Sequence, residues 1–146
     1  MSAFWYFYSN NRMADAMFLV DRGAKINHRD NYGMFALKKE LYNANYENIK
    51  VLLEKGADPN NQDEFQRTVL HLACDYAHRK HYAEIFKLLI KHGASISIQD
   101  FKGRTPIHYM FVKKNKRFER DYYDPMMHGL SILLNKDTLS QIDLNT

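Results

Sequence analysis

The sequence has almost no cysteine and no long apolar run. Its 146 residues include one cysteine, Cys74, so no disulfide can form within the chain. We therefore expect a reducing compartment, cytoplasmic or nuclear. The apolar run at residues 3–8 is far shorter than the ~20 residues of a membrane-spanning helix, and too short for a signal-peptide core. The sequence thus predicts a protein that does not enter a membrane.

An excess of charge of one sign is also small. The formal net charge is +4, while 45% of the residues are hydrophobic and 26% are charged, which is ordinary for a folded protein and excludes a disordered one. The length suffices for one sizeable core and is too short for two ordinary domains. We therefore expect a single domain over residues 1–146.

Glycine is scarce, and its placement indicates a repeat. No glycines group into a phosphate-binding loop; instead Gly23, Gly56 and Gly93 follow one another at spacings of 33 and 37 residues, and an aspartate comes seven residues after each. An apolar stripe with helical spacing precedes each glycine, which is where a helix C-cap is expected. The three stripes are Ala16, Leu19, Val20; Ile49, Leu52, Leu53; and Phe86, Leu89, Ile90.

A second helical signal lies between each aspartate and the next stripe. After Asp100 comes a turn, then Thr105 as N-cap and Pro106 at the first helical position, and Thr68 occupies the same place after Asp63. The segments RTPIHY, RTVLHLAC, VLLEKGADPNNQD and LLIKHGASISIQD resemble the ankyrin repeat. The resemblance implies an all-α repeat solenoid of stacked antiparallel helix pairs with β-hairpin or extended loops. We expect four repeats, approximately 1–29, 30–62, 63–99 and 100–146, the first truncated and the fourth with a long insertion.

Two insertions depart from this frame. Repeat three carries four extra residues and repeat four carries eleven, both between the two helices of the repeat and therefore on the edge opposite the hairpins. The second insertion, residues 113–120, has five cations and one carboxylate, and we single out Lys113, Lys114, Lys116 and Arg117 as candidate binding residues. The two insertions could be solvated loops that matter only for solubility. Alternatively, they form a basic edge that docks an acidic partner. We favour an acidic protein surface over nucleic acid as that partner, because the sequence has no nucleic-acid recognition motif.

The hairpin tips hold aromatic residues. Tyr32 and Phe65 share one repeat position and Phe101 sits one residue earlier. They either lean against the neighbouring hairpin or form a binding surface, since aromatic and arginine side chains are common interface hot spots. Candidate partner-binding residues beside them are Asn31, Glu64, Lys102 and Arg104. Candidates on the inner helices are Tyr42, Asn43, Asp75, Tyr76 and Lys113.

Seven histidines require that metal and acid–base chemistry be weighed. Cys74, His78 and His81 have a spacing that could suit a metal, but a buried structural cysteine is the better interpretation. The resemblance implies that the rings of His71 and His108 hydrogen-bond backbone between repeats. No nucleophile, base and pocket occur together, so the sequence predicts no catalytic residues, no metal and no cofactor.

The resemblance also places Asn27 and Asn60 at the asparagine of the inter-repeat loop. The context of Asn60 is similar to that of asparagine hydroxylation in this family. A structural role, in which both side chains bond backbone, is favoured over modification.

The sequence therefore predicts a non-enzymatic module that binds a partner protein through hairpin tips, inner helices and a basic edge. The alternatives are a scaffold segment of a longer array or complex, and an adaptor of viral or parasite origin that acts on host proteins. The run Phe4 to Tyr8 is aromatic throughout, and part of it should face outward. Because a terminal repeat normally presents a polar face, we expect self-association or a partner at this end.

Overall fold

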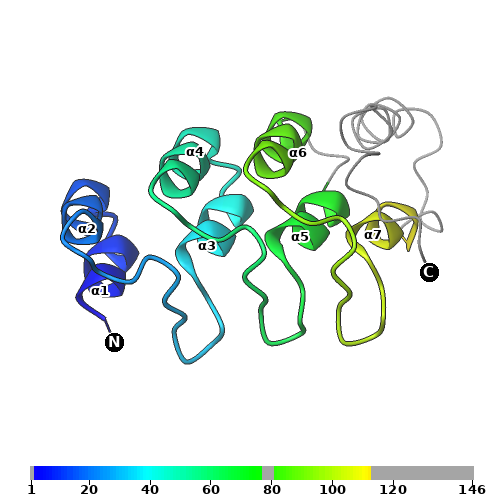
Figure 1. Cartoon of the computed structure of the whole chain (residues 1–146), viewed down its shortest axis with the longest axis horizontal. Helices are drawn as coiled ribbons and strands as arrows, with labels where there is room; N and C mark the ends of the chain where they lie inside the picture. Colours follow the sequence, from blue (N-terminus) through cyan, green and yellow to red (C-terminus); the bar gives the residue numbers. More distant parts are fainter. Residues whose placement is uncertain (1, 77–80, 113–146) are drawn as a thin grey trace.

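The computed structural model describes residues 2–76 and 81–112, with side chains up to Met110, and shows a row of stacked helix pairs (Figure 1). The helices are α1 (Ala3–Ser9), α2 (Met13–Val20), α3 (Ala36–Tyr42), α4 (Tyr46–Glu54), α5 (Val69–Asp75), α6 (Tyr82–Lys91) and α7 (Pro106–Val112). Helices α1, α3, α5 and α7 form the inner row, and α2, α4 and α6 the outer row. Three long loops, which we call the fingers, project beyond the inner row. This confirms the predicted solenoid of helix pairs.

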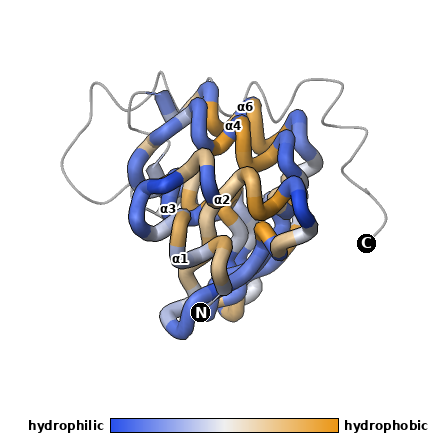
Figure 2. Tube along the Cα trace, turned by 90° about the vertical axis from the view of Figure 1, so that its left-hand side faces the viewer, coloured by the Kyte–Doolittle hydropathy of each residue, from blue (hydrophilic) through white to orange (hydrophobic). Residues whose placement is uncertain are grey.

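Each helix pair packs within itself and against its neighbours. The contacts run α1 with α2, α3 with α4, and α5 with α6, and then between pairs from α3 to α5, α5 to α7 and α4 to α6. Hydrophobic residues gather on the helices, whereas the fingers are mainly hydrophilic (Figure 2). Of the two predicted forms, β-hairpin or extended loop, the fingers are extended loops: the described residues contain no β-strand. None of the described helices is long and apolar enough to cross a membrane.

The glycines end the outer helices as predicted. Gly23, Gly56 and Gly93 have φ values of 93°, 88° and 85°, a region that favours glycine because it has no Cβ. Each lets the following amide turn back, so that Ala57 N–H, for example, donates to the Leu52 carbonyl at 2.9 Å. The apolar stripes before these glycines face the core, and Ile49, Leu52 and Leu89 are fully buried.

The helix starts also lie where the sequence predicts them. Thr68 precedes α5 and forms a capping box with His71, and α7 begins at Pro106, directly after Thr105. The predicted bond of His71 across repeats is confirmed, because its Nε2 lies 3.0 Å from the Arg104 carbonyl oxygen. These local contacts fix the direction in which each inner helix leaves its finger.

The loop asparagines clip one repeat to the next, which matches the structural role favoured from the sequence. Asn60 Nδ2 donates to the Gly93 carbonyl at 2.9 Å, and its Oδ1 accepts from Ser95 N–H at 2.8 Å. Asn27 Oδ1 accepts from Asp58 N–H at 2.8 Å.

The aromatic run in α1 is mostly inside the protein. Phe4, Trp5 and Tyr8 are buried, whereas Tyr6 is 52% exposed. The hydroxyl of Tyr8 donates to Glu40 Oε1 at 2.7 Å, which links α1 to α3. The prediction that part of the run faces outward is confirmed for Tyr6, while self-association at this end stays a prediction.

Candidate protein-binding surface

One aspartate shapes each finger. Oδ1 of Asp63 accepts hydrogen bonds from the backbone N–H groups of Phe65 and Arg67, both at 2.9 Å. Asp30 and Asp100 bind the N–H groups two and four residues later in the same way, at 2.8 to 2.9 Å. Such turns are typical of aspartate. The constant distance from glycine to aspartate therefore sets where each fingertip begins.

The second carboxylate oxygen of two of these aspartates anchors an arginine. Asp63 Oδ2 lies 2.8 Å from Arg67 Nη2, and Asp100 Oδ2 lies 2.8 Å from Arg104 Nη2 and accepts from the Tyr109 hydroxyl at 2.7 Å. Burial alone would raise the pKa of Asp100, but the hydrogen bonds from Tyr109 and Arg104 outweigh it and hold that pKa below its ordinary value. Arg104, a predicted binding residue, thus has its guanidinium engaged within its own finger.

Lys38, in the second repeat, is at the position equivalent to His71 in the third repeat. It forms ion pairs there instead of the hydrogen bonds that His71 makes. Its side chain is 3% exposed, and Nζ lies 3.1 Å from Asp63 Oδ2 and 3.3 Å from Glu64 Oε2. The predicted binding residue Glu64 is therefore paired, although its side chain remains 45% exposed. This buried cation joins the second repeat to the third, and sequence reasoning did not find it.

Two of the three tip aromatics form a pair. The rings of Phe65 and Phe101 lie 6.0 Å apart, and Phe101 N–H donates to the Phe65 carbonyl at 3.2 Å. They nevertheless stay 45% and 55% exposed, so the pair is an accessible apolar patch. Tyr32 is 85% exposed and stands on the first finger beside the exposed Asn31. The interpretation that the tip aromatics lean against the neighbouring hairpin thus holds for this pair, while a binding surface stays a prediction.

Cations flank the aromatic pair. The guanidinium of Arg67 lies 4.9 Å from the centre of the Phe65 ring, and Lys102 Nζ lies 5.4 Å from that of Phe101. Arg67 is neutralised by Asp63, whereas no carboxylate within the described residues pairs with Lys102. We call Phe65, Phe101, Lys102 and Tyr32 the tip surface.

Tyrosines lie at the carboxyl ends of the inner helices. Tyr42 is 38% exposed, and its ring meets that of Tyr76 edge-on at 6.2 Å; Tyr76 in turn contacts Tyr82 at 5.5 Å. Burial raises the pKa of Tyr42, while the charges of Lys38 and Arg67 lower it in part. Asn43 is exposed and Asp75 half-buried at the same ends.

The predicted basic edge lies almost entirely outside the described residues. This applies to His78 and to Lys113, Lys114, Lys116 and Arg117. His81 is described, and it is exposed just before α6 with a φ of 77°. The first insertion does fall between the two helices of its repeat, because residues 76–81 join α5 to α6 where residues 43–45 join α3 to α4.

Cys74 has the environment of a structural cysteine. It is 2% exposed, and burial raises the pKa of its thiol, which keeps it protonated. Among the described residues, no group of three or more histidine, cysteine, aspartate or glutamate side chains could hold a metal ion.

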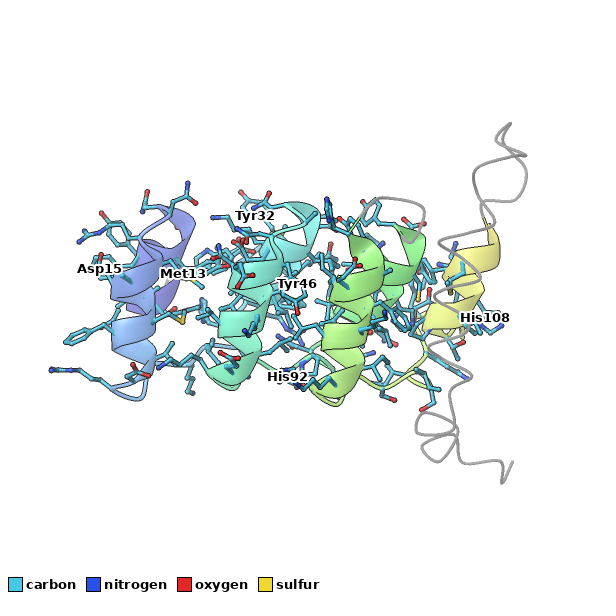
Figure 3. All side chains as sticks on the ribbon, turned by 90° about the horizontal axis from the view of Figure 1, so that it is seen from above. Met13, Asp15, Tyr32, Tyr46, His92 and His108 are labelled. Atoms are coloured by element: carbon cyan, nitrogen blue, oxygen red, sulfur yellow. The ribbon has the colours of Figure 1, made fainter. Side chains whose placement is uncertain are left out.

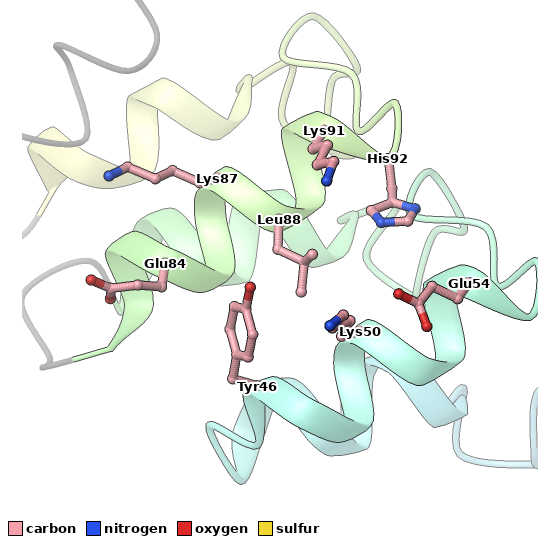
Figure 4. A pocket seen from close by; sticks show the side chains of 8 residues that line it. All are labelled: Tyr46, Lys50, Glu54, Glu84, Lys87, Leu88, Lys91 and His92. Carbon is pink, nitrogen blue, oxygen red and sulfur yellow. The ribbon is translucent and has the colours of Figure 1, made fainter.

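A shallow groove on the outer row was not foreseen. It has a volume of about 290 Å³ and lies between α4 and α6, where Leu88 points toward α4 (Figure 4). Charged side chains of both signs surround it, including Lys50, Lys87 and Glu84. Because charges of both signs line the groove, it favours no single kind of ligand. The groove marks where the outer helix α6 lies beside the outer helix α4 of the preceding repeat.

Comparison with known proteins agrees with this architecture. A family model described as ankyrin repeats, in three copies, matches residues 34–118. An ankyrin repeat protein of variola virus is 29% identical over 153 residues, covering 86% of this chain and 27% of the viral protein. A putative ankyrin repeat protein from Acanthamoeba polyphaga mimivirus is 31% identical over 157 residues, covering 78% of this chain and 27% of the viral protein. Human ankyrin repeat and KH domain-containing protein 1 is 36% identical over 94 residues, covering 60% of this chain and 3% of the human protein. The chain spans about a quarter or less of these relatives.

Proposed function

The chain belongs to the ankyrin-repeat family, whose repeats are a general protein–protein interaction module, and we propose that its tip surface and inner helices bind a partner protein. The family is generally non-enzymatic, and the proposal requires no catalysis. One observation carries it: Phe65 and Phe101 form a contiguous apolar patch at the fingertips that stays about half exposed. Contiguous apolar surface that stays exposed is a common feature of protein interaction sites.

The surroundings of the patch suit a protein ligand. Large aromatic side chains bordered by arginine or lysine dominate the energetics of many interfaces. Tyr42 and Tyr76, whose rings meet edge-on at the carboxyl ends of α3 and α5, add further aromatic side chains on the inner row. Aspartate anchors hold both fingers, so little ordering would be needed on binding, which favours affinity.

The charge balance favours an acidic partner. Arg67 and Arg104 are neutralised within their fingers, but Lys102, whose Nζ lies 5.4 Å from the centre of the Phe101 ring, has no carboxylate partner within the described residues. An acidic surface would associate faster with such a face, in a manner that salt screens.

The basic residues Lys113, Lys114, Lys116 and Arg117 extend the same proposal. Two viral relatives are also in keeping with an adaptor that acts on host proteins. Both points concern which partner is bound, and a partner-capture experiment addresses them together.

The test compares three immobilised proteins in the same cell extract by quantitative mass spectrometry. They are the unchanged chain, the double variant Phe65→Ser with Phe101→Ser, and a control with Lys50→Ser and Lys87→Ser on the outer helices. We expect the tip variant to lose specific partners at least about tenfold, as expected for removal of hot-spot side chains, and the control to retain them. Equal capture by all three, with equal melting temperatures, would rule out the tip surface as the binding site.

A further inference from the structure

Two cations and two carboxylates meet at the junction between the second and third helix pairs, which stand side by side in the row (Figure 3). Lys38 Nζ lies 3.1 Å from Asp63 Oδ2, and Arg67 Nη2 lies 2.8 Å from the same oxygen. The Asp63 side chain has no exposed surface, and its other oxygen already accepts two backbone N–H groups. Asp63 is thus fully engaged, and it balances only one of the two positive charges.

Glu64 balances the second charge, and its side chain is far more exposed than that of Asp63. Its Oε2 lies 3.3 Å from Lys38 Nζ, and 45% of the side chain is exposed. An exposed ion pair of this kind is weak, because water solvates both of its charges. The Lys38 side chain is only 3% exposed, so a ligand reaches its ammonium group by replacing a carboxylate that now contacts it. Of the two carboxylates, Glu64 is the accessible one.

The stack of repeats does not require a carboxylate at this place. At the next junction His71 stands at the position of Lys38, and Phe101 stands at that of Glu64. Phe101 carries no charge, and α5 and α7 nevertheless pack together. The contact between Glu64 and Lys38 is therefore additional to what holds two repeats together.

Gly33 makes room for the Glu64 carboxylate on the first finger. A β-carbon added at Gly33 would collide with Glu64 Oε2. The φ of Gly33, 67°, does not by itself require glycine, because Gln66 occupies the equivalent position of the second finger with a φ of 59°. The missing side chain thus leaves a recess beside Lys38, which the Glu64 carboxylate fills. We call it the Lys38 recess.

We propose that the Lys38 recess receives a carboxylate side chain of an acidic partner protein, and that Glu64 occupies it in the free protein as a built-in competitor. This inference rests on the proposed function, because the recess adjoins the tip surface: Glu64 directly precedes Phe65. A partner carboxylate restores the charge balance that Glu64 provides in the free protein, so the exchange leaves no buried cation unpaired. Charge complementarity therefore selects an acidic ligand.

A fluorescein-labelled hexaglutamate peptide tests the recess without a known partner. Its binding is followed by fluorescence anisotropy at physiological ionic strength. We expect Glu64→Gln to lower the dissociation constant about twofold to fivefold, because the competitor loses its charge. Glu54→Gln is the matched control, since it removes the same charge from an exposed glutamate on α4, and its gain should be clearly smaller. Equal gains in the two variants would mean that only net charge matters, and would overturn the proposal.

Two glycine variants, made in the Glu64→Gln protein, test where the peptide binds. Gly33→Ala places a methyl group inside the recess and should remove the gain that Glu64→Gln provides. Gly103→Ala is the control, because its φ of 72° gives similar backbone strain, while the nearest atom to the added methyl is Gln99 Oε1 at 3.8 Å. The control should keep the gain. Equal peptide affinities in the two glycine variants would overturn the proposal.

These results are separable from those of partner capture. If capture requires Phe65 and Phe101 but the peptide tests fail, the tip surface binds its partner without the Lys38 recess, and this inference is wrong. If capture does not depend on the tip surface while Glu64→Gln and Gly33→Ala behave as expected, the recess is supported and the proposed function of the tip surface is wrong.

Discussion

Replacing His71 by alanine should show how much one ring contributes to holding two repeats together. The ring is fully buried, and its partners define its protonation state. Nδ1 accepts from Thr68 N–H at 3.1 Å, so the proton sits on Nε2, which donates to the Arg104 carbonyl at 3.0 Å. Removing the ring leaves the buried Thr68 N–H without its acceptor, whereas the Arg104 carbonyl keeps its bond from Asp100 N–H at 2.9 Å. At ~1–3 kcal/mol for the unpaired donor, with the lost packing of a buried ring in addition, the free energy of unfolding should fall by about 3 kcal/mol.

The same ring should give a pH dependence of known sign. Burial lowers the pKa of His71 below its ordinary 6.5, so the unfolded chain takes up a proton at a higher pH than the folded protein does. The stabilisation is fully present above pH 6.5 and is lost as the pH falls below that value toward the folded-state pKa. The difference in unfolding free energy between the parent and His71→Ala should therefore shrink between pH 7.5 and more acidic conditions. Histidines present in both proteins largely cancel in this difference.

His108→Ala is the matched control for that measurement. His108 holds the same position one repeat later, and its Nδ1 accepts from Thr105 N–H at 3.0 Å. It is exposed, and no carbonyl among the described residues faces its Nε2, so its loss should cost ~1 kcal/mol or less. Denaturant melts of the three proteins at two pH values decide the matter. Equal costs for the two variants, or a His71 effect that grows as the pH falls, would refute the reasoning.

Three further predictions concern the frame and the insertion. Leu89→Ala should cost ~2–5 kcal/mol in denaturant melts because its side chain is fully buried, and a loss below ~1 kcal/mol would contradict the stripe. Thr68→Ala and Thr105→Ala should each cost ~1 kcal/mol, more for the buried Thr68, and unchanged melts would mean that the inner helices do not start there. Serine in place of Lys113, Lys114, Lys116 and Arg117 should leave the melting temperature nearly unchanged. Partner association, measured by stopped-flow, should become slower and less dependent on salt. Equal association rates and equal salt slopes for the two proteins would mean that these cations are only solvated residues.

The features that the sequence predicted best are those that backbone chemistry dictates. Glycine at positive φ, proline at the first helical position and a spaced apolar stripe each have few alternative uses, so Gly56, Pro106 and Leu52 could be placed without a structure. The sequence shows that an aspartate recurs at a constant distance from each glycine, but it does not show why. The structure gives the reason: Oδ1 of this aspartate accepts two backbone hydrogen bonds that shape the fingertip.

The second repeat shows where sequence reasoning fails. Phe35 and Lys38 replace the expected threonine and histidine, and the segment looks like a weakened repeat. In the structure Phe35 is buried and Lys38 bonds to Asp63 of the next repeat, so the link between repeats is kept by a different pair of groups. Glu40 similarly stands where the next repeat has an alanine, and its buried carboxylate accepts a hydrogen bond from the Tyr8 hydroxyl. A one-chain pattern cannot show such compensation, because each partner lies a whole repeat away.

The tip surface depends on an offset that a repeat pattern treats as an error. Phe101 sits one residue before the position shared by Tyr32 and Phe65, which in sequence weakens the idea of an aromatic row. In space the offset brings Phe101 within 6.0 Å of Phe65, and it leaves Lys102 at the position where the row would have continued. Tyr32, which keeps the register, remains 85% exposed. The break in the repeat thus coincides with the pairing at the tips, and it puts beside the pair a lysine for which the described residues offer no carboxylate.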